Sequence, residues 1–255
     1  MPQFSANLSM LFGEVPFLQR FGAAAAAGFA GVEYVSPYEH PPEIIAGLLH
    51  RHQLAQALFN LPAGDWAAGE RGLACHPGRE AEFQDSVGRA IDYAKALNCP
   101  RVNCLAGIGP PGADRAKLHD TFIENLRFAA RKLGEAGVEL VIEPINFHDI
   151  PGFFLNNSAQ AMGIIEAVGD ANLKLQYDIY HMQRMEGELA ATLQRLLPHI
   201  GHIQVADNPG RHEPGTGEIN YPFLLGLLDR LGYAGWVGAE YHPAAGTVEG
   251  LGWMR

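Results

Sequence analysis

The chain has 255 residues, of which 47% are hydrophobic and 18% are charged, and its formal net charge is −10. This composition is typical of a soluble globular protein and excludes a disordered chain. The 18 lysines and arginines are scattered along the sequence, so no nucleic-acid partner bound through its phosphates is expected.

The cysteines and the N-terminal segment bear on the compartment. Cys75, Cys99 and Cys104 are an odd number without CxxC spacing, which predicts reduced thiols rather than a disulfide framework or a zinc knuckle. The N-terminal segment lacks the basic region and the uninterrupted apolar stretch of a secretory signal. No apolar run approaches the roughly 20 residues of a membrane helix. We therefore expect a cytoplasmic protein with no membrane partner.

Short apolar runs rich in Val, Ile, Leu and Phe recur along the chain and alternate with segments of helical periodicity. In chain order, strands are expected at 4–9, 31–35, 54–61, 101–107, 138–144, 173–181, 202–207 and 235–242. Helical segments between them include 17–28, 80–97 and 118–137. In the last of these, Phe122, Leu126, Ala129 and Leu133 lie on one helix face, and Gly137 is placed to end the helix.

Eight strands that alternate with helices in a chain of this length predict an α/β protein with a (β/α)8 or TIM barrel. A doubly wound open sheet is the alternative, but the residues after the first strand lack its glycine-rich turn. No linker or composition shift divides the chain, so we expect one domain over residues 1–255. Few residues follow the last strand, so the last helix should be shortened. The longest non-periodic segment, 62–80, is expected to be an active-site loop.

Polar side chains stand at the ends of the predicted strands, where the active site of a TIM barrel lies. The fifth to eighth strands supply Glu143, Asp178, Gln204 and Glu240. Burying several carboxylates side by side is costly unless protons or a cation neutralise them. Carboxylate and amide oxygens suit a hard cation such as Mg²⁺ or Mn²⁺, whereas zinc ordinarily brings more His or Cys. The alternative is that these carboxylates cap helices or form salt bridges in loops.

The residues around the seventh strand include other polar groups. His202 has the same strand parity as Gln204 and is expected to support the site, as is Asp207. The segment 214–218, PGTGE, lacks the lysine and the spacing of a phosphate-binding loop. We interpret it as a turn that caps the next helix.

Six sequence segments spread over the chain carry a specific resemblance. They are NLSMLF, NLPAGDWAAGERG, LVIEPIN, QYDIYHMQRMEGE, GHIQVADNPGRHEPGTGEIN and WVGAEYHP. Together they resemble the hydroxypyruvate isomerase family. That family belongs to the xylose isomerase-like barrel superfamily, which also includes ketose 3-epimerases and endonuclease IV.

The resemblance implies that Glu143 and Glu240 are the two catalytic carboxylates. It also implies a divalent metal, Mg²⁺ or Mn²⁺, held by Glu143, Asp178, Gln204 and Glu240. In the related epimerases the strand-seven ligand is usually His, so Gln204 is a departure. Its amide carbonyl is an uncharged and weaker ligand, which bears on how tightly the metal is held.

The substrate implied by the resemblance is a small hydroxy or keto acid, whose carboxylate needs a cationic partner. Arg71 and Arg211 are candidates for that partner. His181 matches a substrate-contacting histidine of the epimerases, and Asp149 stands where those relatives carry a second acidic substrate contact. Asn7 and Asn60 are candidate hydrogen-bond donors, although either could instead organise its turn.

We therefore expect an isomerase that interconverts hydroxypyruvate and tartronate semialdehyde by moving a proton between adjacent carbons through an enediol. An isomerase or epimerase of a related sugar acid or ketose, such as a 2-oxo-tetronate isomerase, would use the same residues. A metal-dependent phosphodiesterase and a non-catalytic binding protein are remoter alternatives. The resemblance implies glyoxylate or sugar-acid metabolism, and a homo-oligomer is compatible with the sequence.

Overall fold

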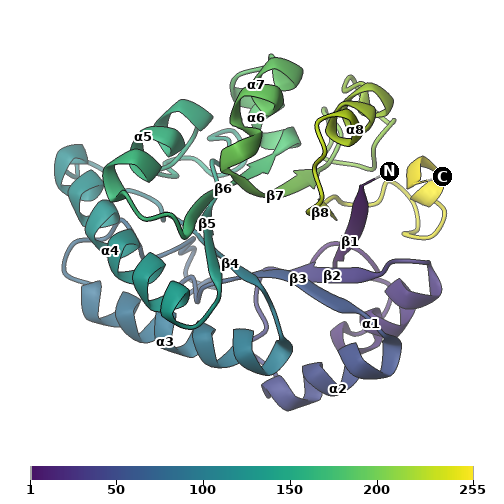
Figure 1. Ribbon diagram of the computed structural model, residues 1–255, viewed down its shortest axis with the longest axis horizontal. Helices are drawn as coiled ribbons and strands as arrows, with labels where there is room; N and C mark the ends of the chain where they lie inside the picture. The colour runs from purple at the N-terminus through teal and green to yellow at the C-terminus, as the bar shows by residue number, and fades with distance from the viewer. Residues whose placement is uncertain (1, 255) are drawn as a thin grey trace.

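The computed structural model describes residues 2–254, which form a closed barrel of eight parallel strands surrounded by helices (Figure 1). The strands pair in chain order, and β8 closes the barrel against β1. They are β1 (Gln3–Asn7), β2 (Gly31–Tyr34), β3 (Ala55–Asn60), β4 (Arg101–Cys104), β5 (Glu139–Ile142), β6 (Leu173–Asp178), β7 (Ile200–Val205) and β8 (Trp236–Ala239). The predicted TIM barrel is confirmed.

The helices follow the strands and cover the outside of the barrel (Figure 1). They are α1 (Phe17–Ala26), α2 (Pro42–His52), α3 (Glu80–Leu97), α4 (Arg115–Glu135), α5 (Ser158–Val168), α6 (Ile179–Met185), α7 (Leu189–Leu196) and α8 (Tyr221–Arg230). Two short 3-10 helices are η1 (Leu197–His199) and η2 (Leu251–Met254). The shortened last helix is confirmed, since η2 is the helical segment described after β8.

The predicted helix face of α4 is buried against the barrel, as expected from its spacing. Phe122, Leu126, Ala129 and Leu133 are all fully buried. Gly137 follows the helix with φ of 73°, a left-handed conformation that glycine adopts without strain. The helix begins three residues before its predicted start because the Asp114 carboxylate accepts a hydrogen bond from the N–H of Ala116 at 2.9 Å.

The predicted strand at 173–181 was wrong over its last three residues, which begin α6. The side chain of Asp178 accepts hydrogen bonds from the backbone N–H groups of Tyr180 at 2.8 Å and His181 at 3.3 Å. A carboxylate that caps the first helical turn ends the strand at its own position. The cap turns the chain at once, so that a residue of the first helical turn, His181, lies beside the end of β6.

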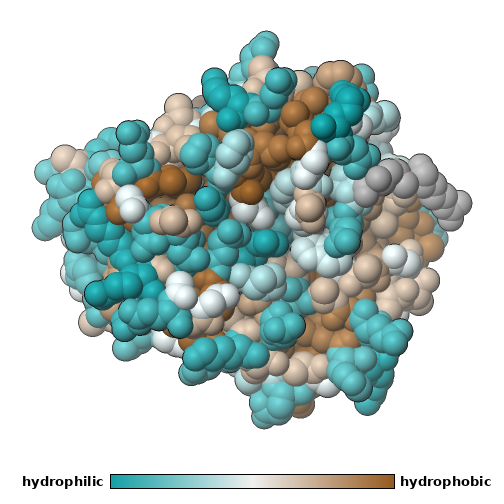
Figure 2. Space-filling view, in the orientation of Figure 1, coloured by the Kyte–Doolittle hydropathy of each residue, from teal (hydrophilic) through white to brown (hydrophobic). Residues whose placement is uncertain are grey.

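On the face shown in Figure 2 hydrophilic residues line much of the left and lower edges, and hydrophobic residues show between helices, as between α6 and α8. No helix within residues 2–254 is long and apolar enough to cross a membrane. Cys75, Cys99 and Cys104 are free and buried.

The interior of the barrel contains a polar cluster around the carboxylate of Glu33, which is fully buried. This carboxylate accepts hydrogen bonds from Ser5 Oγ at 2.7 Å and Gln204 Nε2 at 2.8 Å, and it lies 2.9 Å from His202 Nε2. Burial favours a raised pKa for Glu33, but the charge and hydrogen bond of His202 outweigh burial and lower the pKa. The buried charge is therefore fully partnered.

Gly238 on β8 provides the space that this carboxylate occupies. A Cβ atom at Gly238 would lie 2.3 Å from Glu33 Oε1, closer than any van der Waals contact. We predict that Gly238→Ala lowers the free energy of unfolding by about 1–3 kcal/mol, the usual cost of overpacking a core. Urea denaturation measures this change.

Gly88→Ala is the matched control, because Gly88 is exposed in α3 and a Cβ there meets nothing within 4 Å. This substitution should raise the stability by up to about 1 kcal/mol through helix propensity. Equal stabilities for the two variants would contradict the tight packing assigned to Gly238.

Candidate active site

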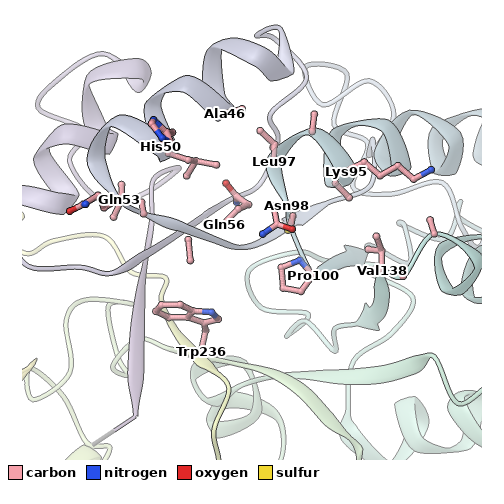
Figure 3. A pocket seen from close by; sticks show the side chains of 18 of the residues that line it. Ala46, His50, Gln53, Gln56, Lys95, Leu97, Asn98, Pro100, Val138 and Trp236 are labelled. Atoms are coloured by element: carbon pink, nitrogen blue, oxygen red, sulfur yellow. The ribbon is translucent and has the colours of Figure 1, made fainter.

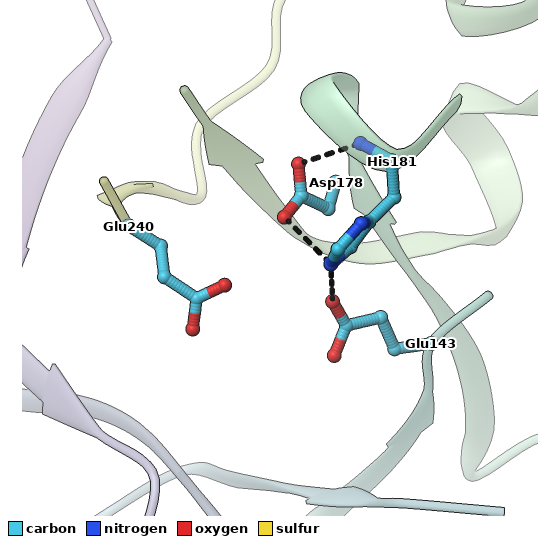
Figure 4. A group of neighbouring side chains, drawn as sticks. All are labelled: Glu143, Asp178, His181 and Glu240. Carbon is cyan, nitrogen blue, oxygen red and sulfur yellow. Dashed lines mark hydrogen bonds and ion pairs between the residues drawn. The ribbon is translucent and has the colours of Figure 1, made fainter. Parts of the chain in front are cut away.

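Four buried ionisable side chains meet at the C-terminal ends of the strands (Figure 4). Glu143 follows β5, Asp178 ends β6, His181 lies in the first turn of α6, and Glu240 follows β8. One ligand atom from each side chain lies within 4.8 Å of the corresponding atoms of the others. The structure thus brings together three of the four predicted metal ligands, Glu143, Asp178 and Glu240, and places His181 beside them.

A cavity of about 140 Å³ adjoins this cluster. Its polar lining residues are Asn60, Arg71, Glu143, His181, Arg211 and Glu240. Its apolar and aromatic walls include Met10, Val35, Trp66 and Phe153. Drug-sized ligands occupy pockets of roughly 300–1,000 Å³, so this cavity fits a molecule of only a few carbons.

A larger cavity of about 1160 Å³ lies at the opposite end of the barrel, near the starts of the strands (Figure 3). Leu97, Asn98, Pro100, Val138 and Trp236 are among its lining residues, which include no Asp or Glu within the described part of the chain. Because the chemistry of a TIM barrel is placed at the C-terminal ends of its strands, we assign the site to the smaller cavity.

Each of the two glutamates is held by an asparagine amide. Asn103 Nδ2 donates to Glu143 Oε2 at 3.0 Å, and Asn7 Nδ2 donates to Glu240 Oε1 at 2.8 Å. Asn7 therefore contacts a catalytic candidate and does more than organise its turn. Asn103 is not among the predicted site residues, although it is a polar residue between the apolar Val102 and Cys104 of β4, and it pairs in register with Asn60.

Burial raises the pKa of all three carboxyl groups above its ordinary value. Burial and the charges of Glu240 and Asp178 raise the pKa of Glu143 strongly. Burial raises the pKa of Glu240 to about 8 and that of Asp178 to about 6, although Arg211 opposes both shifts. One arginine cannot balance three ionised carboxylates, so the site holds protons or takes up further positive charge.

Arg211 brings a positive charge next to two of these carboxylates. Its Nη2 atom lies 2.7 Å from Glu240 Oε2 and 3.8 Å from Asp178 Oδ2. The loop that carries Arg211 is organised by Asp207, whose carboxylate accepts hydrogen bonds from the N–H groups of Gly215 at 2.7 Å and Ile219 at 3.1 Å. The PGTGE segment is thus part of a turn, while the side chain of Asn220 provides the cap of α8.

The other predicted substrate contacts occupy different positions around the cavity. Asn60 and Arg71 line it, and the Arg71 guanidinium stacks 3.8 Å above the ring of Trp66. The carboxylate of Asp149 binds protein groups instead, since it accepts hydrogen bonds from Asn146 and Tyr180 and forms an ion pair with Arg184.

Gln204 is bound within the interior cluster at both ends of its amide. Its Nε2 atom donates to Glu33, and its carbonyl accepts a hydrogen bond from Gln176 Nε2 at 2.7 Å. A carbonyl has a second lone pair, so ligation by Gln204 stays a prediction. By contrast, Asp178 Oδ2 is buried and accepts no hydrogen bond from the described residues. A buried carboxylate oxygen that accepts no hydrogen bond and lies beside two glutamates fits a hard divalent cation.

Comparison with known proteins agrees with this geometry. Residues 21–255 match the family described as xylose isomerase-like TIM barrel. The chain is 55% identical to hydroxypyruvate isomerase of Escherichia coli K12, over 100% of this chain and 98% of the relative. It is 52% identical to 2-oxo-tetronate isomerase of Cupriavidus necator, again over 100% of this chain and 98% of the relative.

A crystal structure described as AP endonuclease, family 2, from Brucella melitensis superposes with a TM-score of 0.98 and 47% identity. The alignment covers 100% of this chain and 98% of that one. The barrel, the buried carboxylates at its C-terminal end and these full-length similarities agree: the chain is an isomerase that belongs to the hydroxypyruvate isomerase family of xylose isomerase-like TIM barrels.

Proposed function

We propose that the enzyme interconverts hydroxypyruvate and tartronate semialdehyde by proton transfer through an enediol. The observation that supports this proposal best is the approach of Glu143 and Glu240 to within 4.8 Å beside a cavity of about 140 Å³. Hydroxypyruvate is a three-carbon keto acid and matches the size of that cavity. The relative at 55% identity carries the name of this activity.

The reaction needs a base at one carbon and an acid at its neighbour. In the forward direction a carboxylate takes a proton from C3 of hydroxypyruvate and a carboxylic acid delivers a proton to C2. The hydroxyl proton of O3 passes to O2, so that C3 becomes the aldehyde and C2 carries the hydroxyl. Glu143 and Glu240 divide these roles, because both line the cavity and two buried carboxyl groups close together disfavour ionisation of both at once, which raises the pKa of each. The asparagines bonded to them fix the direction of each carboxyl group.

The substrate carboxylate is assigned to the arginines of the cavity. Arg211 and Arg71 both line it, and guanidinium groups pair with carboxylates through two parallel hydrogen bonds. His181 also lines the cavity and stands beside Glu143, where it can donate to a substrate oxygen. These contacts orient a small keto acid with its carbons between the two glutamates.

We also propose a divalent cation, Mg²⁺ or Mn²⁺, as cofactor. Glu143, Asp178 and Glu240 would hold it, with Gln204 as the predicted fourth ligand. Such a cation supplies positive charge that neutralises the carboxylates and polarises the oxygens of the substrate. The Asp178 Oδ2 atom, which is buried and accepts no hydrogen bond from the described residues, supports this assignment.

A four-carbon substrate, 2-oxo-tetronate, is the second candidate, and one feature of the cavity favours it. Met10, Val35 and Trp66 line both this cavity and an adjoining one of about 510 Å³. A longer acid could therefore extend its tail past these three residues.

A DNA substrate fits the chain poorly, since the net charge is −10 and the cavity is small. A cytoplasmic location, a role in glyoxylate metabolism and a homo-oligomer stay predictions.

The substrate assignment is tested with a panel of hydroxypyruvate, 2-oxo-tetronate and a six-carbon ketose. We predict the highest kcat/KM for hydroxypyruvate. The ketose should be turned over at least about 100-fold less efficiently, because it leaves the arginines of the site without a carboxylate partner. An absence of hydroxypyruvate turnover would rule out hydroxypyruvate as the substrate. A preference for 2-oxo-tetronate would establish the four-carbon acid in its place.

The two-carboxylate mechanism is tested with Glu143→Gln and Glu240→Gln, each of which keeps the shape of the side chain and removes the acid–base group. We predict that kcat falls by about 10²–10⁴-fold in each variant. Glu166→Gln, at an exposed position of α5, is the matched control and should keep full activity. Near-normal turnover by either site variant with its fold intact would contradict the mechanism.

The cofactor assignment is tested by removing divalent cations with a chelator. We predict that turnover drops by about 100-fold or more and returns on adding Mg²⁺ or Mn²⁺, since a metal supplies several kcal/mol of charge stabilisation. Calorimetric titration of the chelated protein with Mn²⁺ should show binding that Asp178→Asn removes. Unchanged turnover together with no measurable binding would show that the site works without a metal.

A further inference from the structure

The amide of Asn146, which lies in the loop after β5, has a single orientation consistent with its neighbours. Its Oδ1 atom accepts the backbone N–H of Asp149 at 2.9 Å, while its Nδ2 atom donates to the carboxylate oxygen Oδ2 of Asp149 at 3.0 Å. The flipped amide would set oxygen against carboxylate and N–H against N–H, so the contacts themselves fix the assignment.

The same Nδ2 atom also points at the ring of His181. It lies 2.6 Å from Nδ1 of His181, and both side chains are buried, with 0% and 2% of their surface exposed. Because the amide nitrogen donates, Nδ1 must accept and therefore carries no proton. An imidazole ring without a proton on Nδ1 carries its proton on Nε2.

The Nε2 atom of His181 is the one that faces the active site. It lies 3.8 Å from Glu143 Oε1 and 3.6 Å from Asp178 Oδ2 (Figure 4), and His181 lines the cavity. An N–H group has no lone pair for a cation, so it acts there as a hydrogen-bond donor.

We propose that Asp149 and Asn146 are positioning residues that hold His181 as the neutral Nε2–H tautomer, so that its ring donates to a substrate oxygen and does not bind the metal. The donor role rests on the proposed function, whereas the tautomer follows from the hydrogen bonds alone. A neutral imidazole that donates to the developing enediolate stabilises it without adding a further proton to the site.

Through these contacts Asp149 acts on the substrate indirectly, by way of Asn146 and His181. Its carboxylate is held by the hydroxyl of Tyr180 at 3.0 Å and by the ion pair with Arg184. A carboxylate fixed in this way fixes the Asn146 amide, which in turn fixes the proton on His181. The proximity of His181 to the carboxylates thus reflects donation and not metal ligation.

The test replaces the donor by an acceptor of the same shape. In Asn146→Asp the carboxylate can only accept, so the ring proton should move to Nδ1. The double variant Asn146→Asp with Asp149→Asn exchanges the carboxylate and the amide, so the pairing between residues 146 and 149 is kept. Long-range ¹H–¹⁵N spectra of histidine-labelled protein report which ring nitrogen carries the proton.

We expect Nε2–H in the wild type, before and after addition of Mg²⁺, and Nδ1–H in both variants. Since a lost oxyanion donor costs about 10²–10³-fold in kcat, we expect a loss of that size with hydroxypyruvate in both variants. Asp149→Asn alone is the control for the double variant, because the side-chain oxygen of residue 149 can still accept from Asn146 Nδ2 and the backbone N–H of residue 149 still donates to Asn146 Oδ1. Asn157→Asp is the control for a new charge in the same loop, because a carboxylate at residue 157 keeps the cap of α5, in which the side chain accepts from the backbone N–H of Gln160 at 2.8 Å. Both controls should keep the Nε2–H tautomer.

A wild-type proton on Nδ1 would overturn the proposal, as would loss of the Nε2 proton when Mg²⁺ is added. Unchanged kcat in variants whose proton has moved would overturn the donor role. If the wild type shows Nε2–H but does not turn over hydroxypyruvate, the substrate assignment fails and the tautomer assignment stands.

Discussion

The close burial of Glu143, Asp178 and Glu240 beside one small cavity is the constraint on which the rest of the site depends. Carboxylates in a low-dielectric site repel one another and lose their hydration, which is why all three have raised pKa values. Arg211 offsets part of that charge. The burial and mutual repulsion that make this arrangement energetically unfavourable also raise the pKa values of the carboxyl groups, so that they can exchange protons near neutral pH.

Polar side chains of the barrel interior, beneath the active site, hold these carboxylates in position. Asn7 donates to Glu240 and also lies 3.4 Å from Glu33, so it joins the catalytic mouth to the buried cluster inside the barrel. Glu33 in turn orients Gln204 and pairs with His202. The barrel interior is therefore polar near its C-terminal end, and Gly238 leaves the room that a charged side chain requires.

Much of this arrangement could be predicted from residue order alone, because parallel strands carry their C-terminal residues to one end of a barrel. That rule places Glu143, Asp178 and Glu240 together. It could not give the partner of each side chain, which depends on how the barrel closes. Asn103 was missed for this reason, and the hydrogen bonds at both ends of Gln204 were not foreseen.

The position of His181 shows a second limit of sequence reasoning. The alternation of apolar and polar residues in β6 continues past Asp178 to Ile179, so the pattern cannot tell where the strand becomes a helix. The Asp178 cap decides that point, and it turns His181 toward Glu143. The tautomer of His181 depends on Asn146, which is 35 residues away in the sequence, and only the folded loop brings the two together.

The central claim is that protons pass between substrate carbons and the buried glutamates, and isomerisation of hydroxypyruvate in D₂O tests it most directly. Proton abstraction by a carboxyl group that exchanges with solvent places deuterium at C2 of the tartronate semialdehyde formed, which NMR detects at early times against a reaction without enzyme. We predict that deuterium is incorporated there during turnover. A product that carries only the substrate's own hydrogen at C2 would show a direct shift between the carbons and would contradict the two-carboxylate mechanism.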